Sequence, residues 1–394
     1  MTLRIPDYGG RCFDALPAAI ERLFGGAGNA LRLGGVLDGR YDRVVLVYLD
    51  AFAWRFAERH ADHPLLRTAD LVEPLTSQFP STTVVHTTTI NTGLTLGAHG
   101  LYEWFVLEPR LDRIVAPLLF SFAGDERRET LAPTGFRAGD LFPAESVYER
   151  LASAGVASHV AMPAPIASAT PNLHFLRGTT VHRFEAAEDG FAALGASLAR
   201  EERAYGLIYL PEVDAHMHMN GPDDPGAAAL FDRALTAIER APFPPGTLVL
   251  LTSDHGMAAV SPERTTYVNV AWPELVQHVR HGADARPLAP AGSCRDLFLH
   301  AAPGRVDDVV DGLRARLADV ADVHATADLV VAGAFGPAPT DALLSRLADV
   351  VCLPFPGEAV YWLEPGRFEQ QFLGQHGGLS PDELEIPLVA RVIP

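Results

Sequence analysis

The chain has 394 residues, of which 48% are hydrophobic and 20% charged, a composition typical of a globular protein with one large domain or two unequal ones. All 31 basic residues are arginine and the formal net charge is −18, which excludes a nucleic-acid duplex as the expected partner because few cations are left to neutralise phosphates. The three cysteines form no CxxC pair, the first ten residues are mostly polar, and no apolar run is long enough to span a bilayer. We therefore expect a soluble, cytoplasmic protein without a membrane span.

Short apolar runs without polar alternation are typical of parallel strands that are covered on both faces. In chain order, the sequence predicts a helix at 12–24, a strand at 43–49, helices at 51–60, 145–154 and 192–204, a strand at 206–210, a helix at 227–240 and a strand at 247–252. This alternation predicts a doubly wound α/β fold, with a mostly parallel sheet flanked by helices. Ligands of such folds bind beyond the carboxyl ends of the strands.

A second unit is expected to interrupt this fold. After Gly256 the chain becomes rich in loops, and it then shows a strand at 296–301, a helix at 306–317 and a Pro/Gly-rich stretch near 333–340. We interpret residues 259–360 as a small inserted α+β subdomain, placed like a cap, and residues 1–258 with 361–394 as the main domain. The irregular segment 105–140 is expected to line a pocket.

Four segments far apart in the sequence carry side chains that bind metals, and three of these segments follow a predicted strand. The residues are Asp50, Asp214, His218, Asp254, His255 and His376. Three carboxylates and three imidazoles suit two divalent cations, zinc foremost, with manganese or iron as alternatives. Each motif alone has a structural explanation, such as a turn or a helix cap. Their joint occurrence at strand ends of one α/β chain favours a metal site.

The spacing of these residues has a physical meaning. Asp214 and His218 are four residues apart, so one helical turn would place both on the same face. In an extended segment, His216 would join Asp214 instead, and we favour His218. Asp254 and His255 are adjacent at a strand end, where the turn of the chain lets both side chains reach inward.

A nucleophile is expected in the segment 79–93, FPSTTVVHTTTINTG. Pro80 suits the start of a helix, which places Thr82 or Thr83 in the first turn. Free backbone N–H groups and the helix dipole favour an anion at this position. A divalent cation that coordinates the hydroxyl can activate it for attack. The structural alternative is that both threonines only cap the helix.

The motifs LVYLDAF, FPSTT…TGLTLGAHG, DAHMH, SDHGM and GQHGGLSP resemble those of the alkaline phosphatase superfamily, and specifically its type I phosphodiesterase/nucleotide pyrophosphatase family. The similarity runs from the strand that ends at Asp50 to HGGLSPDELEIPL near the C-terminus. It implies an alkaline phosphatase-like fold whose main domain is catalytic, and hydrolysis of phosphodiesters or nucleotide pyrophosphate bonds. In the family the nucleophile lies ten residues before the glycine of a TG pair, and this spacing from Gly93 selects Thr83 over Thr82.

The resemblance also implies how the two metals are held. One ion would be bound by Asp214, His218 and His376. The other would be bound by Asp50, Asp254 and His255, with Thr83 beside it. Thr83 would attack phosphorus in line and form a phosphothreonine intermediate, which water would then hydrolyse from the opposite face.

The sequence departs from the family pattern after the His99–Gly100 pair. Trp104 stands at the offset where the family has an asparagine that helps to hold the phosphoryl oxygen, so the resemblance does not by itself imply this contact or nucleotide specificity. Tyr102 or Arg295 is a candidate to substitute for it in substrate binding. Tyr102, Trp104 and Phe105 could form an aromatic wall for a substrate, or belong to the ordinary core. The CxPxR-type motif of sulfatases is absent, which argues against sulfate-ester hydrolysis.

Several functions compete on the same residues. The leading one is hydrolysis of a small-molecule phosphodiester or nucleotide pyrophosphate, and few arginines near the motifs favour a diester over a dianionic monoester. A phosphomonoesterase or phosphonate hydrolase is the nearest alternative. A metal-dependent mutase or phosphotransferase would share the metal site, and a catalytically silent binding protein would be expected to lose ligands. The sequence does not indicate the natural substrate or the oligomeric state.

Overall fold

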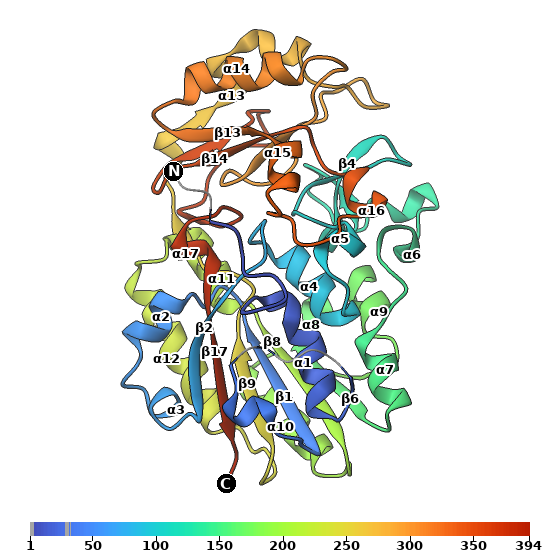
Figure 1. The fold of residues 1–394 in the computed structure, drawn as a ribbon, viewed down its shortest axis with the longest axis vertical. Coiled ribbons are helices and arrows are strands. Elements are labelled where there is room, and N and C mark those ends of the chain that lie inside the picture. The colour runs from blue at the N-terminus through green and yellow to red at the C-terminus, as the bar shows by residue number, and fades with distance from the viewer. Residues whose placement is uncertain (1–3, 28–30, 32) are drawn as a thin grey trace.

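The computed structural model describes residues 4–27, 31 and 33–394, and Figure 1 shows a larger and a smaller part stacked along the long axis. The larger part is built on a seven-stranded sheet with the order β2-β17-β9-β1-β8-β6-β7. Its strands are β1 (Arg43–Leu49), β2 (Leu71–Thr76), β6 (Ala157–Pro163), β7 (Thr180–Phe184), β8 (Ala204–Leu210), β9 (Leu248–Thr252) and β17 (Glu385–Val392). Strand β17 runs antiparallel to both its neighbours, and the other adjacent strands pair in parallel. The predicted α/β fold with a mostly parallel sheet is confirmed.

Helices cover both faces of this sheet, which explains the continuous apolar runs of its strands. In β1, Val44 and Leu46 belong to one hydrophobic core, and Val45 and Val47 belong to the core on the opposite face. The first core contains residues of α1 (Leu16–Leu23), α4 (Thr83–Thr92) and α7 (Val147–Ser153). The second contains residues of α2 (Trp54–Arg59), α3 (Pro64–Arg67), α10 (Ala187–Leu198), α11 (Glu212–Asn220) and α12 (Pro225–Glu239).

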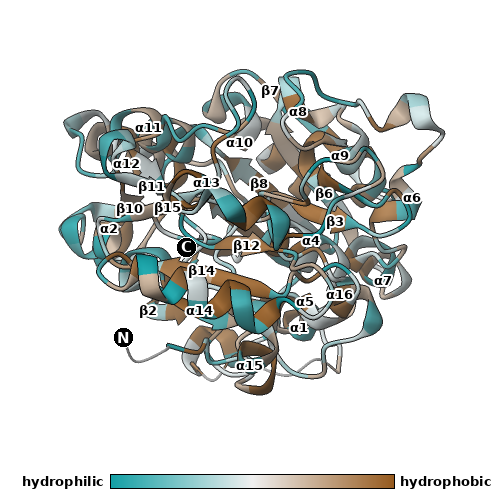
Figure 2. Ribbon diagram, turned by 90° about the horizontal axis from the view of Figure 1, so that it is seen from above, coloured by the Kyte–Doolittle hydropathy of each residue, from teal (hydrophilic) through white to brown (hydrophobic). Residues whose placement is uncertain are grey.

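The smaller part is built on an antiparallel sheet of β12 (Leu297–Leu299), β14 (Val350–Pro354) and β13 (Ala321–Ala325). Helix α14 (Val306–Leu317) packs on this sheet through buried residues such as Val309 and Leu313, and Figure 2 shows hydrophilic and hydrophobic residues alternating along it. The segment predicted to be irregular contains a second small sheet of β3 (Val106–Glu108), β4 (Arg113–Ala116) and β5 (Ser121–Phe122).

One hydrophobic core connects the smaller part with the start of α4. It joins Val84 and Val85 of α4 to Leu297 of β12 and Val350 of β14. The smaller part thus packs directly behind the helix that carries the expected nucleophile. The boundaries 259–360 of an inserted subdomain stay a prediction.

Short elements complete the chain around the larger sheets. They are α5 (Leu96–His99), α6 (Ala138–Leu141), α8 (Ala164–Ala167), α9 (Thr170–Phe175), α13 (Val268–Ala271), α15 (Thr326–Val331), α16 (Asp341–Leu344), α17 (Pro381–Leu384), β10 (Ala258–Ala259), β11 (Thr265–Tyr267), β15 (Ala359–Tyr361) and β16 (Gly374–Gln375). Most predicted elements differ in extent from the observed ones by a few residues at their ends, and two of these differences have a clear structural cause. The helix predicted at 192–204 ends at Leu198, because Ala204 already pairs with Arg43 as the first residue of β8. The strand predicted at 296–301 spans only Leu297–Leu299, since the Asp296 side chain closes a turn with Ser293.

Two further sequence predictions concern the whole chain. Among the described residues, no helix is long and apolar enough to cross a membrane. Cys12, Cys294 and Cys352 are buried free thiols. The cytoplasmic location stays a prediction.

Candidate active site

The sheet order brings the predicted metal ligands together at the carboxyl ends of three adjacent strands, β9, β1 and β8. Asp50 directly follows β1, and Asp254 with His255 comes shortly after β9. Asp214 lies in α11, which begins two residues after β8. His376 follows β16, which pairs with β10 just beyond His255. This placement is the one expected for ligand sites in open α/β sheets.

Asp50, Asp254 and His255 form one buried group. The Nε2 atom of His255 lies 3.5 Å from Asp50 Oδ1 and 3.2 Å from Asp254 Oδ2. Within the described part of the chain, these two carboxylate oxygens have no hydrogen-bond partner. A buried polar atom without a partner is costly. The three side chains therefore have the composition and the free ligand atoms of a cation site.

A second group adjoins the first. Asp214, His255 and His376 each offer a ligand atom, and these atoms lie within 4.8 Å of one another. His218 Nε2 lies 3.3 Å from Asp214 Oδ1, and the ring centroids of His218 and His376 are 5.2 Å apart. His216 instead contacts Asp224 at 2.8 Å, on the other side of the helix from this group. The helix thus brings His218, not His216, to Asp214.

Backbone carbonyl groups orient all three imidazoles in the same way. The Nδ1 atom of His218 lies 2.9 Å from Gly374 O, that of His255 lies 2.8 Å from Gly256 O, and that of His376 lies 2.9 Å from Ser81 O. Each ring can therefore donate its Nδ1–H to a carbonyl and direct its Nε2 lone pair at the cluster. This arrangement is typical of metal-binding histidines.

The electrostatics of the cluster point to a missing positive charge. Burial raises the pKa of Asp50 well above its usual value, and the charges of Asp254 and Asp214 raise it further. Burial also lowers the pKa of His376, which favours the neutral, metal-binding form of its ring. For Asp214, burial acts to raise the pKa, yet the neighbouring His218 lowers it below the usual range. Divalent cations would neutralise these carboxylates, so the donor set fits a metal centre.

The two candidate nucleophiles differ in position, although they are adjacent in sequence. Thr82 is the N-cap residue of α4 and Thr83 is its first residue. Thr83 Oγ1 lies 3.1 Å from His255 Nε2. The Thr82 hydroxyl is fully buried and has no partner among the described residues. The structure thus places Thr83 against the ligand cluster, at a helix start whose free amides favour an anion.

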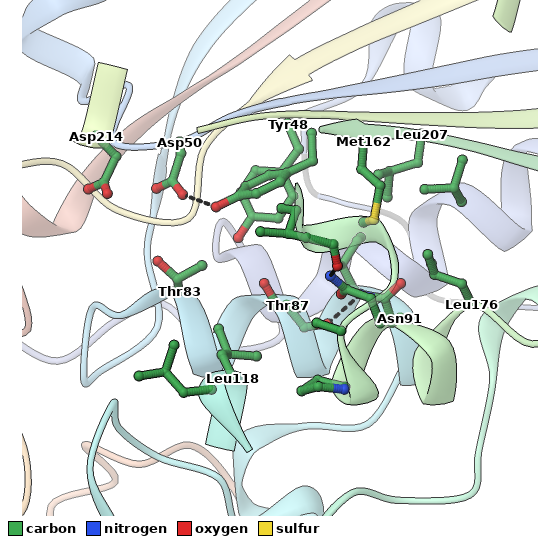
Figure 3. Close-up of a pocket in the computed structure, with 18 of the residues that line it drawn as sticks. Tyr48, Asp50, Thr83, Thr87, Asn91, Leu118, Met162, Leu176, Leu207 and Asp214 are labelled. Carbon is green, nitrogen blue, oxygen red and sulfur yellow. Dashed lines mark hydrogen bonds between the residues drawn. The ribbon is translucent and has the colours of Figure 1, made fainter. Parts of the chain in front are cut away.

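A cavity of about 180 Å³ opens beside Thr83 and runs away from the ligand cluster. Figure 3 shows Asp50, Asp214 and Thr83 at one end and Met162, Leu176 and Leu207 at the other. The residues around it are Tyr48, Asp50, Thr83, Thr87, Ile90, Asn91, Trp104, Leu118, Leu119, Arg128, Val160, Met162, Ile166, Ala169, Pro171, Asn172, Leu176, Leu207, Tyr209 and Asp214. The lining is largely apolar, and among the described residues that form it Arg128 is the one cationic side chain. The predicted contribution of the segment 105–140 is seen at Leu118, Leu119 and Arg128.

The three residues suggested for substrate binding lie in different surroundings. Trp104 lines the cavity. Tyr102 is fully buried and packs edge-on against Phe298, outside the cavity lining. Arg295 is 1% exposed and pairs with Glu383 at 3.0 Å. Its guanidinium also bonds to three backbone carbonyls, so it has no donor left for a substrate.

Sequence reasoning missed Tyr209, whose hydroxyl donates a hydrogen bond to Asp50 Oδ2. This bond leaves Asp50 Oδ1 for a metal. A signal was present, since Tyr209 lies near the end of a predicted strand beside the strand that ends at Asp50. The pairing of Tyr48 with Tyr209 in the parallel register was needed to use it. Helices α8 and α9, which wall the far end of the cavity, carried no motif.

Comparison with protein families gives the same assignment as the motifs. The sequence model of the family "Type I phosphodiesterase / nucleotide pyrophosphatase" matches residues 44–379. The chain therefore belongs to this family of the alkaline phosphatase superfamily, a family of hydrolases of phosphodiester or pyrophosphate bonds. No curated protein sequence matches it.

Solved structures share the fold at low sequence identity. Murine ectonucleotide pyrophosphatase/phosphodiesterase 5 is 18% identical with a TM-score of 0.64, and the match covers 89% of this chain and 88% of that one. The human protein of the same name is also 18% identical, with a TM-score of 0.65 and coverage of 89% and 87%. Phosphonoacetate hydrolase from Sinorhizobium meliloti 1021, in complex with phosphonoformate, is 20% identical with a TM-score of 0.59 and coverage of 89% and 90%.

Proposed function

We propose that the protein hydrolyses phosphodiesters or nucleotide pyrophosphate bonds with two divalent metal ions and Thr83 as the nucleophile. The observation that carries this proposal is the Thr83 hydroxyl, which lies 3.1 Å from His255 Nε2 at the start of α4 and beside a buried cluster of Asp and His. A murine relative with the same fold is described as inactive when a threonine is replaced by alanine, and that variant was solved with AMP. Both facts support a threonine nucleophile.

The two ligand groups define how the ions would be held. Asp50, Asp254 and His255 would bind one ion beside Thr83. The second ion would be bound by Asp214, His218 and His376. We propose zinc first because imidazole and carboxylate ligands suit it, with manganese or iron as alternatives. When bound, the ions lower the pKa of the attacking hydroxyl and stabilise the charge on the phosphoryl oxygens.

The chain's own residues would act in two displacements. Thr83 Oγ1 loses its proton to solvent and forms a bond to phosphorus, while the bond from phosphorus to the leaving oxygen breaks and this oxygen takes up a proton from solvent. The product of this step is a phosphothreonine whose phosphate, for a diester substrate, still carries the second organic substituent. Water then attacks phosphorus and the bond from phosphorus to Thr83 Oγ1 breaks. Thr83 Oγ1 takes up a proton, which restores the hydroxyl, and the phosphate monoester is released. The first-turn amides of α4 would stabilise the negative charge that develops in both steps.

The cavity favours a diester over a monoester. A diester carries a second organic substituent, and the slot beside Thr83 is lined mainly by apolar side chains such as Leu118, Met162 and Leu207. A dianionic monoester would need several cationic groups, whereas Arg128 is the one cation among the lining residues. Phosphonate hydrolysis is the second candidate, supported by the similarity to phosphonoacetate hydrolase.

The test combines metal analysis with hydrolysis assays in zinc or manganese. The substrates are bis-p-nitrophenyl phosphate, p-nitrophenyl phosphate and phosphonoacetate. We expect about two transition-metal ions per chain and the fastest turnover with the diester. Faster monoester or phosphonoacetate cleavage would replace the diester assignment. Absence of both metal and turnover would leave a non-catalytic binding protein on this fold.

A further inference from the structure

Buried carboxylate oxygens without a hydrogen-bond partner occur at a second place in the molecule, outside the proposed metal centre. Among the described residues, five carboxylates have a buried oxygen without a hydrogen-bond partner: Asp50, Asp214, Asp254, Glu103 and Asp296. The first three are the carboxylates of the proposed metal centre. Glu103 and Asp296 lie outside it, and both are fully buried. A buried carboxylate with an unsatisfied oxygen is costly wherever it occurs, so this pair requires a partner of its own.

Four segments of the chain converge around Glu103 and Asp296. The loop after α5 and the loop before β12 are joined by the bond from Gly292 N to Phe105 O, at 2.9 Å. Ser293 Oγ donates to His376 O at 2.8 Å, and Ser81 N donates to Gly377 O at 3.2 Å. These bonds bring the start of α4 and the turn after β16 to the same place. Glu103 therefore lies close to Asp296 and to Thr82, the residue that precedes Thr83.

Each carboxylate is fixed through one oxygen and free at the other. Asp296 Oδ1 accepts bonds from Ser293 N at 3.0 Å and Ser293 Oγ at 2.7 Å, while Oδ2 has no partner. Glu103 Oε2 accepts a bond from Trp104 N, while Oε1 has no partner. The buried Thr82 hydroxyl lies beside Glu103 and, among the described residues, makes no hydrogen bond of good geometry. Two carboxylates and a hydroxyl thus each present a free, buried ligand atom.

The pKa values of Glu103 and Asp296 indicate that the pair lacks sufficient positive charge nearby. Burial raises the pKa of Glu103, the neighbouring Asp296 raises it further, and the Thr82 hydroxyl beside it lowers it. Burial likewise raises the pKa of Asp296. All five N–H groups of the Arg295 guanidinium, one residue before Asp296, are hydrogen-bonded to Glu383 and backbone carbonyls. The charge of Arg295 acts to lower the pKa of Asp296, yet the effect of burial is larger and this pKa stays raised.

We propose that Thr82, Glu103 and Asp296 bind a third, hard divalent cation such as Mg²⁺ or Ca²⁺. An all-oxygen donor set selects these ions, whereas the His-rich cluster beside it suits zinc. The ion holds the N-cap residue of α4 and so positions Thr83, which follows it. Its binding is separate from the two catalytic ions and does not depend on the proposed activity.

The test uses the full-length, zinc-saturated protein. Elemental analysis after dialysis against Mg²⁺ is expected to find about one additional ion per chain, and Tm is expected to rise by a few degrees as Mg²⁺ is titrated. Glu103→Gln and Thr82→Val are expected to lose the added ion and the rise in Tm while keeping the zinc. Asp254→Asn is the matched control, because it removes a ligand of the zinc cluster and is expected to keep the response to Mg²⁺.

A shared proton between the two carboxyl groups is the outcome that would overturn the proposal. In that case neither Mg²⁺ nor Ca²⁺ changes the Tm of the wild-type protein. Glu103→Gln would then be at least as stable as the wild type, because its amide can donate to Asp296 as the proton does. If Glu103→Gln fails to fold, the nearly isosteric Thr82→Val decides, and an unchanged response to Mg²⁺ in that variant contradicts the site.

Discussion

At the scale of single residues, the helix start separates the roles of two adjacent threonines. We expect Thr83→Ala to lower turnover on the order of 10³-fold or more while both catalytic ions stay bound, because the ligand side chains are untouched. Thr82→Val keeps the Thr83 hydroxyl and should still form the covalent phosphothreonine. Steady-state kinetics, metal analysis and mass spectrometry of the trapped intermediate check this. Normal activity of Thr83→Ala would move the nucleophile to Thr82 or to water.

The bond from Tyr209 to Asp50 gives a second prediction at this scale. Tyr209→Phe removes the donor that holds Asp50 Oδ2, so Asp50 can rotate away from the position that presents Oδ1. Loss of such an outer hydrogen bond costs about 10–100-fold in metal affinity or activity. The readout is the zinc concentration needed for half-maximal activity. Tyr205→Phe, on the same strand and away from the cavity, is the matched control, and equal shifts in both variants would exclude an orienting role for Tyr209.

At the scale of elements, the buried pair of Arg295 and Glu383 joins the smaller part of the molecule to α17. The guanidinium lies just before β12, bonds to carbonyls at and beyond the end of β14, and reaches Glu383 in α17. Arg295→Met leaves the Glu383 charge buried without its partner, which costs about 3–5 kcal/mol of unfolding free energy. Urea unfolding measures this loss. A raised KM with unchanged stability would instead place Arg295 at the substrate.

The arrangement of the elements decided which parts of the site were predictable from the sequence. Ligands such as Asp50 and Asp254 were predictable because adjacent parallel strands end at one edge of a sheet, and Asp214 with His218 because helical spacing is local. The role of Arg295 was not predictable, because its partner Glu383 lies 88 residues away in the sequence and no local pattern links the two residues. The cavity was equally hidden, since Leu118, Met162 and Leu207 meet only through the packing of three distant segments.

At the scale of the whole molecule, buried neutral histidines outside the metal cluster tie stability to pH. Burial lowers the pKa of His86 to about 4, and that of His99 and His300 to about 3. Above the usual histidine pKa of about 6.5, the folded and unfolded chains both keep these rings neutral. As the pH falls below this value, the three histidines become protonated in the unfolded chain but stay neutral in the folded one. Stability is therefore lost progressively from about pH 6.5 down to the folded pKa values.

The contribution of a single histidine to this pH dependence can be measured at His99. Its Nδ1 accepts a bond from Leu101 N at 3.1 Å, and its Nε2 lies 3.2 Å from Thr89 Oγ1, so the ring is held neutral. His99→Asn keeps a side-chain acceptor for Leu101 N but cannot titrate. Between about pH 6 and pH 4.5 its unfolding free energy should therefore fall less steeply than that of the wild type, by up to about 1.4 kcal/mol per pH unit. Urea unfolding across this range gives both slopes, with the exposed His281→Asn as control. Equal slopes for wild type and His99→Asn would mean that the folded protein protonates His99 as readily as the unfolded chain does.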